Sequence, residues 1–433
     1  MNNKKENGII WKSALAVVYS QTVRDYDEEP GGQKMNRSVF LKKSIRKWTA
    51  LSLIVIILSC LTPVWADSIF ECRYSVTFGQ SDARAMLKLI NDFRTGSEAW
   101  YWNSDNKTKT VLTDLSPLTY DYQLEKDAMQ RAAEIALYYS HTRPDGTGWD
   151  TVGSLTYGEN IAAGYPITYI NVFGLWQESS ADYEHQGHRR NMLGRNYATV
   201  GIGHVTAGGC EFWVQEFGLH NSGAGKTAVV DTEKEMTVQI NEAILSGKSI
   251  TGFASRTLNL DYETRMELPL LNVTVSRDDS WSYITDIKVK PEKWTSSDTE
   301  AVSVEEGTAT GFIVGKTKLT ATLWNSQYSV TANVVYDGLQ ADMVLPKQLT
   351  RIDQNVFERN SIKAVDIPEG VTLISSGAFK NCLNLKQVRI CGENTEIDDD
   401  AFPSGQAICF ICPRGSKAQI YAEKNHYKMV QVK

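Results

Sequence analysis

The sequence predicts a multidomain α+β protein that runs from a helix-and-sheet domain through a β-sandwich to a short repeat solenoid. Three observations predict this order. Helical apolar periodicity turns into strand-like runs before residue 220, period-two alternation follows to about residue 340, and a repeat of 22 to 23 residues fills the rest. A chain of 433 residues is also too long to share one core, so about two to four domains are expected.

The helix-and-sheet domain is expected over residues 80–220. Ser81 and Asp82 have side chains that can cap a first helix, and Asp121 can cap a second helix that ends at His141. Apolar side chains of both helices recur at helical spacing and are expected in the core: Met86, Ile90, Phe93, Leu124, Ala128, Ala132, Ile135, Ala136 and Tyr139.

A third helix and two strands are expected to complete this domain. The helical pattern covers residues 169–180, and the strand-like runs cover 199–205 and 210–217. Helices followed by strands predict helical layers packed on an antiparallel sheet. The run Asn-Ser-Gly-Ala-Gly at 221–225 has the composition of a flexible linker to the next part of the chain.

Two strand-rich parts follow, over residues 226–340 and 341–433. In the first, apolar residues alternate with Thr and Asn, which predicts a small β-sandwich: Leu319, Ala321, Leu323, Val330, Ala332 and Val334. In the second, an Ile/Phe pair recurs at the spacing of leucine-rich solenoids: Ile352 and Phe357, Ile374 and Phe379, Ile397 and Phe402. The tail at 421–433 is expected to cap the solenoid.

The N-terminal segment carries an export signal. Residues 35–47 hold five basic side chains and no acidic one, 51–61 form a mostly apolar run, and Val-Trp-Ala at 64–66 suits signal cleavage. We assign residues 35–66 to a signal peptide, with a membrane anchor as the alternative, and leave 1–34 as an extension of uncertain role. The protein is therefore expected to be secreted or at the cell surface. It would contact a membrane only if this segment stays uncleaved or is lipidated.

The chain after Ala66 is acidic, with 35 Lys and Arg against 46 Asp and Glu. Nucleic acids and anionic lipid surfaces attract proteins through clustered Lys and Arg side chains. We therefore expect no nucleic-acid partner.

Cysteines offer two candidate pairs. Cys72 and Cys210 are candidates for a disulfide that would tie the start of the exported chain to the first domain. Cys409 and Cys412 have the C-x-x-C spacing of some metal and redox sites. Because no second pair stands at a matching spacing, buried cysteines of the repeat are the favoured interpretation.

Polar residues that can carry chemistry gather in four segments of the first domain. They are Ser-His-Thr-Arg-Pro-Asp-Gly at 140–146, Gly-Glu-Asn-Ile at 158–161, Gly-His-Arg-Arg-Asn-Met-Leu at 187–193 and Trp-Val-Gln-Glu-Phe-Gly at 213–218. In this order they resemble the CAP superfamily, which includes the cysteine-rich secretory proteins, antigen 5 and the pathogenesis-related group 1 proteins. The resemblance implies an α-β-α sandwich with a central cleft.

The resemblance also implies cleft residues. Many members line the cleft with two histidines and two acidic residues, and His141, Glu159 and His188 match three of them. The remaining acid of the family stands where this chain has Ser179, and Glu178 lies one residue earlier. The chain therefore departs from the family pattern at the fourth position, for which Glu178 and Ser179 are the candidates.

Three roles remain open for His141, Glu159 and His188. Two imidazoles and a carboxylate suit a divalent metal such as zinc, with a position left for water or a ligand. Without metal, they suit the general acid and base of a secreted hydrolase, although no Ser/His/Asp or Cys/His pattern supplies a nucleophile. As buried groups, they could instead only fix the loops around the cleft. We favour binding of a metal or small ligand over catalysis.

Two downstream segments carry further resemblances. Trp-Thr-Ser-Ser-Asp at 294–298 and the residues after it resemble the group-2 bacterial immunoglobulin-like domains over 256–337, which implies a spacer or adhesive module. Gly-Ala-Phe-Lys-Asn-Cys-Leu-Asn-Leu at 377–385 resembles BspA-type leucine-rich repeats, which implies contact with a protein or a cell-surface ligand. The whole chain is thus expected to be an exported, surface-associated binding protein.

Overall fold

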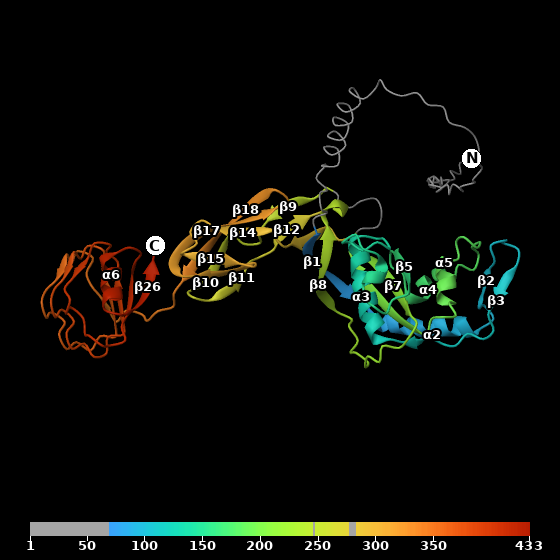
Figure 1. Ribbon diagram of the computed structural model, residues 1–433, viewed down its shortest axis with the longest axis horizontal. Helices are drawn as coiled ribbons and strands as arrows, with labels where there is room; N and C mark the ends of the chain where they lie inside the picture. Colours follow the sequence, from blue (N-terminus) through green and yellow to red (C-terminus); the bar gives the residue numbers. More distant parts are fainter. Residues whose placement is uncertain (1–68, 246, 277–282) are drawn as a thin grey trace, which may run out of the picture. The chain divides into compact units, whose positions relative to one another are not determined.

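The computed structural model describes residues 69–245, 247–276 and 283–433 (Figure 1). The predicted signal at 35–66 and the extension at 1–34 lie outside the described residues. Within the described part of the chain, no helix is both long and apolar enough to cross a membrane.

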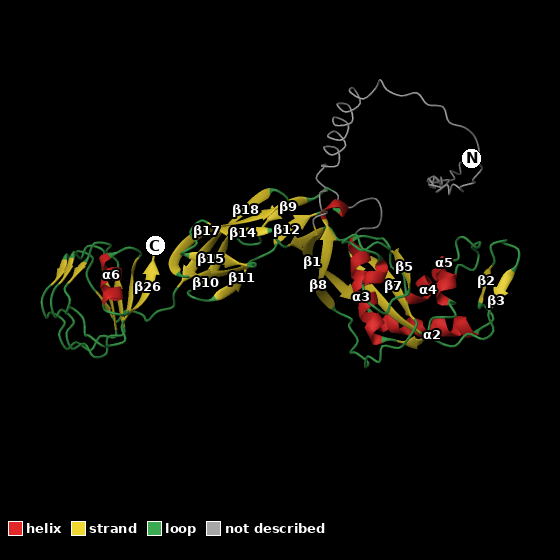
Figure 2. Cartoon of the chain, in the orientation of Figure 1, coloured by secondary structure: helices red, strands yellow, loops and turns green. Residues whose placement is uncertain are grey.

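The described chain is a mixed α/β structure that is rich in strands, and its α-helices gather before residue 193 with one exception, α6 (Figure 2). The α-helices are α2 Gln80–Thr95, α3 Tyr122–Leu137, α4 Tyr169–Gln177, α5 Gly187–Met192 and α6 Lys417–Lys424. Short 3-10 turns are η1 Trp149–Thr151 and η2 Glu242–Ile244. The first seven strands are β1 Ile69–Phe78, β2 Trp100–Trp102, β3 Lys109–Val111, β4 Thr119–Tyr120, β5 Gly158–Gly164, β6 Thr199–Ala207 and β7 Cys210–Gly218.

Helices lie on both faces of the first sheet. Strands β5, β7, β6 and β1 are neighbours in this order, and each pair is antiparallel. Successive side chains of a strand point to opposite faces. Phe212 and Val214 of β7 pack in the same core as α3, whereas Trp213 and Phe217 pack in the same core as α2 and α4.

Helix α3 rests almost directly on the sheet because two residues of β6 have no side chain. A Cβ on Gly201 would lie 2.1 Å from the carbonyl carbon of Leu124, and one on Gly203 would lie 2.1 Å from the carbonyl oxygen of Ala128. Any larger residue at either position would push the helix outward.

The helix boundaries confirm one expected cap and correct another. Asp121 caps α3 by accepting hydrogen bonds from the backbone N–H groups of residues 123 and 124. The expected cap by Ser81 and Asp82 is wrong, because α2 already begins at Gln80 after an N-cap glycine that makes no side-chain bond. Ser81 instead donates its N–H and hydroxyl to the Asp231 carboxylate.

Two helix ends also fall earlier than expected. The second helix ends at Leu137 rather than His141, because Tyr138 already has extended backbone angles. The third ends at Gln177 rather than residue 180, because Glu178 takes the left-handed conformation with φ 45°. Both changes place polar residues just outside a helix, where their side chains are free to reach across the sheet edge.

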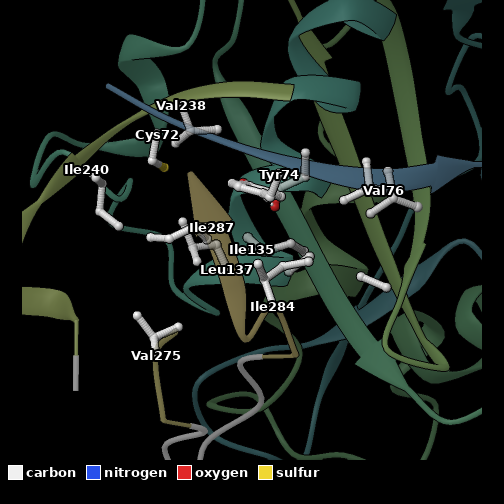
Figure 3. Close-up of a cluster of buried hydrophobic side chains, with 14 of the residues drawn as sticks. Cys72, Tyr74, Val76, Ile135, Leu137, Val238, Ile240, Val275, Ile284 and Ile287 are labelled. Carbon is white, nitrogen blue, oxygen red and sulfur yellow. Dashed lines mark hydrogen bonds between the residues drawn. The ribbon is translucent and has the colours of Figure 1, made fainter. Parts of the chain in front are cut away.

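The larger core joins α3 and β1 to strands from later in the chain (Figure 3). Cys72, Tyr74 and Val76 of β1 pack in this cluster with Ile135 of α3 and Ile287 of a later strand. All nine side chains expected in the helix cores are buried or, for Tyr139, partly buried. The helical periodicity of the sequence therefore identified the packed faces of both helices.

The expected disulfide between Cys72 and Cys210 is wrong, since both are free thiols in the structure. Cys210 pairs with Ala207 at the end of the β6–β7 hairpin, and the β1–β6 register places that end beside Val76. Cys72 lies four residues further along β1, about 13 Å at roughly 3.3 Å per residue. A disulfide needs Cα atoms within about 7 Å.

Residues 233–335 form strands that pair with one another and with β1. They are β8 Glu233–Asn241, β9 Ser249–Gly252, β10 Thr257–Asp261, β11 Arg265–Glu267, β12 Leu271–Thr274, β13 Asp286–Val289, β14 Lys293–Ser296, β15 Val302–Glu305, β16 Thr308–Gly311, β17 Ile313–Leu323 and β18 Ser326–Val335. The apolar positions of the predicted alternation in β17 and β18 are all buried. The immunoglobulin-like assignment stays a prediction.

Residues 343–432 repeat a strand-and-turn unit in parallel register. The strands are β19 Met343–Val344, β20 Arg351–Ile352, β21 Ala364–Ile367, β22 Leu373–Ile374, β23 Gln387–Ile390, β24 Glu396–Ile397, β25 Cys409–Pro413 and β26 Lys428–Val432. Phe357, Phe379 and Phe402 stack in sequence, with ring centroids 5.1 Å and 4.9 Å apart. Cys412 is buried, but Cys409 is only partly buried and Cys391 is exposed, so burial does not explain all the cysteines.

Candidate functional site

Three predicted site residues line one hollow of about 540 Å³, although they come from distant parts of the chain. His141 follows α3, Glu159 lies on the edge strand β5, and His188 lies in the first turn of α5. The complete lining is His141, Glu159, Asn160, Glu178, Glu184, His185, Gly187, His188, Arg190 and Asn191.

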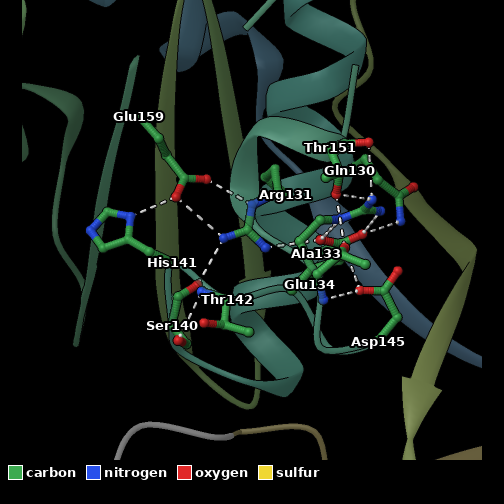
Figure 4. A network of polar contacts seen from close by, with 12 residues as sticks. Gln130, Arg131, Ala133, Glu134, Ser140, His141, Thr142, Asp145, Thr151 and Glu159 are labelled. Carbon is green, nitrogen blue, oxygen red and sulfur yellow. Dashed lines mark hydrogen bonds and ion pairs between the residues drawn. The ribbon is translucent and has the colours of Figure 1, made fainter. Parts of the chain in front are cut away.

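His141 is oriented by a buried carboxylate. Its Nδ1 lies 2.7 Å from Oε1 of Glu159, and the other carboxylate oxygen accepts a 2.7 Å hydrogen bond from Nε of Arg131 (Figure 4). Burial would raise the pKa of Glu159, but the bonds from His141 and Arg131 outweigh it and hold that pKa below its ordinary value. Glu159 is therefore ionised and is held in place by these two partners.

Arg131 connects this pair to a second buried acid. Its guanidinium also donates to Glu134 at 2.9 Å and to the Ser140 carbonyl at 2.8 Å (Figure 4). Glu134 in turn pairs with Arg143 at 2.7 Å. Arg143 thus belongs to the frame that holds the His141 loop, as does Asp145, whose carboxylate accepts from Thr147.

His188 is oriented in the same way by Glu178. Its Nδ1 lies 2.6 Å from Oε1 of Glu178, and the second oxygen of that carboxylate accepts from the backbone N–H of Arg189. The left-handed turn at Glu178, which ends α4, aims the side chain toward α5. Ser179 faces elsewhere and accepts a hydrogen bond from the Arg189 guanidinium. Of the two candidates for the fourth position, Glu178 is the one beside the histidine.

A third histidine, which sequence reasoning missed, lies on the rim of the hollow. His185 Nδ1 is 2.6 Å from Oδ1 of Asp182, and the imidazole is 78% exposed. The hydrogen bond to Asp182 raises the pKa of His185 above its ordinary value. The spacing Asp-x-x-His at 182–185 is the feature of the sequence that could have indicated this pair.

The geometry separates ligand candidates from orienting groups. Within the described residues, no three His, Cys, Asp or Glu side chains are arranged to hold one metal ion. The expected ligand set of His141, Glu159 and His188 therefore stays a prediction. Glu159 bonds to Arg131 and His141, while His141 and His188 contact their carboxylates through Nδ1, so within the described residues Nε2 of each ring is the nitrogen left for another partner. Metal-binding histidines commonly have this arrangement, in which a carboxylate bonds to the ring nitrogen that does not contact the metal.

Two residues of the 213–218 segment lie behind the hollow. Gln215 is fully buried and accepts a 2.9 Å hydrogen bond from the Asn160 amide, which supports the hollow from inside. Glu216 is also fully buried but lies on the α3 side of the sheet. It is the cross-strand neighbour of Glu159 on β5.

Comparison with known families finds two matches in this chain. Residues 87–217 match the model of the cysteine-rich secretory protein family (CAP), and residues 322–409 match the BspA type leucine rich repeat region, in six copies. The uncharacterized protein YkwD of Bacillus subtilis (strain 168) is 33% identical over 111 residues, which cover 24% of this chain and 40% of that protein. The chain thus contains a CAP domain and BspA-type repeats. This combination suggests a cell-surface or secreted protein.

Three solved structures are similar over about a third of the chain. The crystal structure of NaASP2 with Zn2+ has 14% identity and a TM-score of 0.27, covering 36% of this chain and 88% of that one. An outer surface protein from Borrelia burgdorferi has 17% identity and a TM-score of 0.24, covering 32% and 92%. The hookworm platelet inhibitor has 16% identity and a TM-score of 0.22, covering 33% of this chain and 74% of that one. At such TM-scores these likenesses carry no argument about function.

Proposed function

From a CAP domain joined to BspA-type repeats, we propose an exported, surface-associated binding protein. Its cleft binds a divalent metal such as zinc, or a small ligand, at His141 and His188. Its repeats bind a protein or cell-surface ligand. The observation that carries the cleft proposal is the pair of imidazoles in one hollow, each held at Nδ1 by its own carboxylate.

The donor chemistry fits a borderline metal ion. Imidazole nitrogen is a common zinc ligand, and a carboxylate on the opposite ring nitrogen fixes the tautomer that presents Nε2 to the ion. His141 and His188 would hold the ion, while Glu159 and Glu178 would orient them. A bound ion would act as a Lewis acid and as an anchor for a ligand oxygen. With two protein ligands, its remaining positions stay open to water or ligand.

The same histidines keep a secreted hydrolase as the second candidate function. An imidazole side chain can serve as a general acid or a general base. Binding is favoured because Nδ1 of each ring contacts a carboxylate and no serine or cysteine within the described residues hydrogen-bonds to either ring.

Zinc titration of the purified chain from residue 67 tests the cleft. His141→Ala and His188→Ala should each weaken zinc binding by more than about tenfold, and Glu178→Gln by about 10- to 100-fold, the range for groups that orient a ligand. Ser179→Ala and His220→Ala, which alter a neighbour of Glu178 and an exposed histidine outside the hollow, should leave the affinity unchanged.

Two results would change this conclusion. Unaltered zinc affinity in the His141→Ala and His188→Ala variants would place the ion elsewhere. Turnover of a peptide, ester or cell-wall substrate that both substitutions abolish would favour the hydrolase.

Removal of the repeats tests the second half of the proposal. A chain that ends at residue 340 should keep zinc affinity and lose attachment to the cell or host surface that the full chain binds. Equal attachment of both chains would contradict a binding role for the repeats.

A further inference from the structure

A buried row of polar residues lies behind the cleft, between the sheet and α3. Glu216 of β7 has Glu159 of β5 as its partner on one side and Gly201 of β6 on the other. Gly201 lies against Leu124 and residue 125 of α3, and Glu159 bonds to Arg131 of the same helix. Glu216, between these two, therefore lies beneath the middle of α3.

Asp127 also lies between the sheet and α3. It lies one helical turn before Arg131, so both residues share one side of α3. The loop before β5 closes over it, because a Cβ on Gly153 would lie 2.1 Å from Oδ2 of Asp127. The same loop is fastened beside Glu216, since the N–H of Tyr157 donates to the Phe217 carbonyl at 2.8 Å. Thr156 lies directly before Tyr157 in this loop.

Four oxygen atoms here receive no hydrogen bond from a donor within the described residues: Oδ2 of Asp127, Oγ1 of Thr156 and both carboxylate oxygens of Glu216. Glu216 lies within hydrogen-bond range of a second carboxyl group, that of Glu159, and the two can bond only when one of them is protonated. Glu216 is 0% exposed, Thr156 6% and Asp127 7%. Buried polar atoms are almost always paired, so buried oxygens that no donor reaches, on segments that pack against one another, indicate a bound group that pairs them.

The local charges are also unbalanced. Glu134 is paired with Arg131 and Arg143, and Glu159 with Arg131 and His141. Asp127 and Glu216 have no ion-pair partner within the described residues. Burial raises the pKa of both carboxyl groups, that of Glu216 well above its ordinary value, with the charge of Glu159 adding to the effect. A double positive charge at this point would balance the two ionised acids.

We propose that Asp127, Thr156 and Glu216 form a buried site for one hard divalent cation, with Ca²⁺ as its probe. Carboxylate and hydroxyl oxygens are the donors that such ions take, and Ca²⁺ accepts them in irregular arrangements. The site differs from the imidazole cleft in its atoms and in its metal preference, and it does not depend on the proposed function. The cation would pin the 153–156 loop to α3, behind the Glu159 that orients His141.

Thermal unfolding of the chelator-treated chain from residue 67 tests this site at neutral pH. Added Ca²⁺ should raise the melting temperature of the wild-type chain by several degrees, since a ligand that binds only the folded state stabilises it. Glu216→Gln and Asp127→Asn should abolish the rise. Glutamine keeps a donor for Glu159, so the Glu216→Gln variant should fold. Metal analysis after dialysis against Ca²⁺ should find one bound ion in the wild type that Glu216→Gln lacks.

Controls separate this site from the cleft. Glu233→Gln, an exposed acid on β8, and His188→Ala should keep the full Ca²⁺ response. A wild-type melting temperature that does not change when Ca²⁺ is added would overturn the proposal. Glu216 would then be a protonated acid that donates to Glu159. A Ca²⁺ response retained in both Glu216→Gln and Asp127→Asn would also overturn it, because the ion would then bind elsewhere.

Discussion

Arg131 is the residue on which the buried polar network of the CAP domain depends. Its side chain is fully buried and binds two carboxylates and the carbonyl of Ser140. A buried charge is stable only where its partners compensate the loss of water. The single guanidinium thus links the loop that carries His141 to the strand that carries Glu159.

Arg131→Met should lower the free energy of unfolding by about 3–5 kcal/mol, because it leaves Glu159 and Glu134 without their shared buried cation. Urea denaturation measures the loss. Arg195→Met removes the exposed ion pair with Asp114 and is the matched control, for which no measurable loss is expected. Equal losses in the two variants would contradict a central role for Arg131.

Glu216 should make stability depend on pH when divalent cations are removed. Its pKa in the folded state lies well above the unfolded value, so the folded state holds a proton that the unfolded state releases. This contribution is present below the unfolded pKa and is lost as pH rises toward the folded pKa. With chelator present, the wild type should therefore lose stability relative to Glu216→Gln between about pH 5 and 8. Parallel stability curves for the two proteins would show that Glu216 does not titrate in this window.

At the scale of elements, the packing of α3 on β6 determines where the site lies. Gly201 and Gly203 let the helix backbone approach the strand, and this close contact brings the residues of α3 over Glu216 and Glu159. The end of α3 at Leu137 and of α4 at Gln177 then sends His141 and Glu178 toward the same hollow.

Gly203→Ala should destabilise the protein by about 1–3 kcal/mol, because its Cβ would lie 2.1 Å from the carbonyl oxygen of Ala128. Gly174→Ala in α4 is the matched control. Its Cβ would meet nothing within 4 Å, and alanine is the better helix former, so stability should hold or rise. Chemical denaturation of both variants checks the difference, and a neutral Gly203→Ala would mean that α3 shifts without cost.

At the scale of the whole molecule, β1 joins the CAP sheet to the strands that follow it. It pairs with β6 near Phe78 and with β8 and β13 near Cys72. The core around Cys72 accordingly includes Leu271, Val273 and Val289 from residues beyond the CAP match. The two parts of the chain share apolar burial, so they should unfold together.

A fragment of residues 69–225 should therefore be less stable than one of residues 69–340. The shorter fragment lacks β8 and β13 and exposes one face of the β1 core to water. Thermal unfolding followed by circular dichroism should give a clearly lower melting temperature for the shorter fragment. Identical melting temperatures would show that the CAP domain folds without its neighbour strands.

The sequence alone determined what depends on local spacing. The cap at Asp121, the buried faces of α2 and α3 and the alternation in β17 and β18 follow from neighbours within a few residues, and all appear in the structure. The ordered motifs also singled out His141, Glu159 and His188, which line one hollow, and the CAP and BspA-type matches fall where the motifs stand.

Only the tertiary structure decided what depends on register and on chain reversals. A left-handed residue at the end of α4 placed Glu178 rather than Ser179 beside His188, and the offset of β1 against the β6–β7 hairpin kept Cys72 away from Cys210. Pairing across β5 and β7 placed Glu216 beside Glu159. Such contacts join residues tens of positions apart, and a shift of one residue in a strand sends a side chain to the opposite face, so no local pattern in the sequence encodes them.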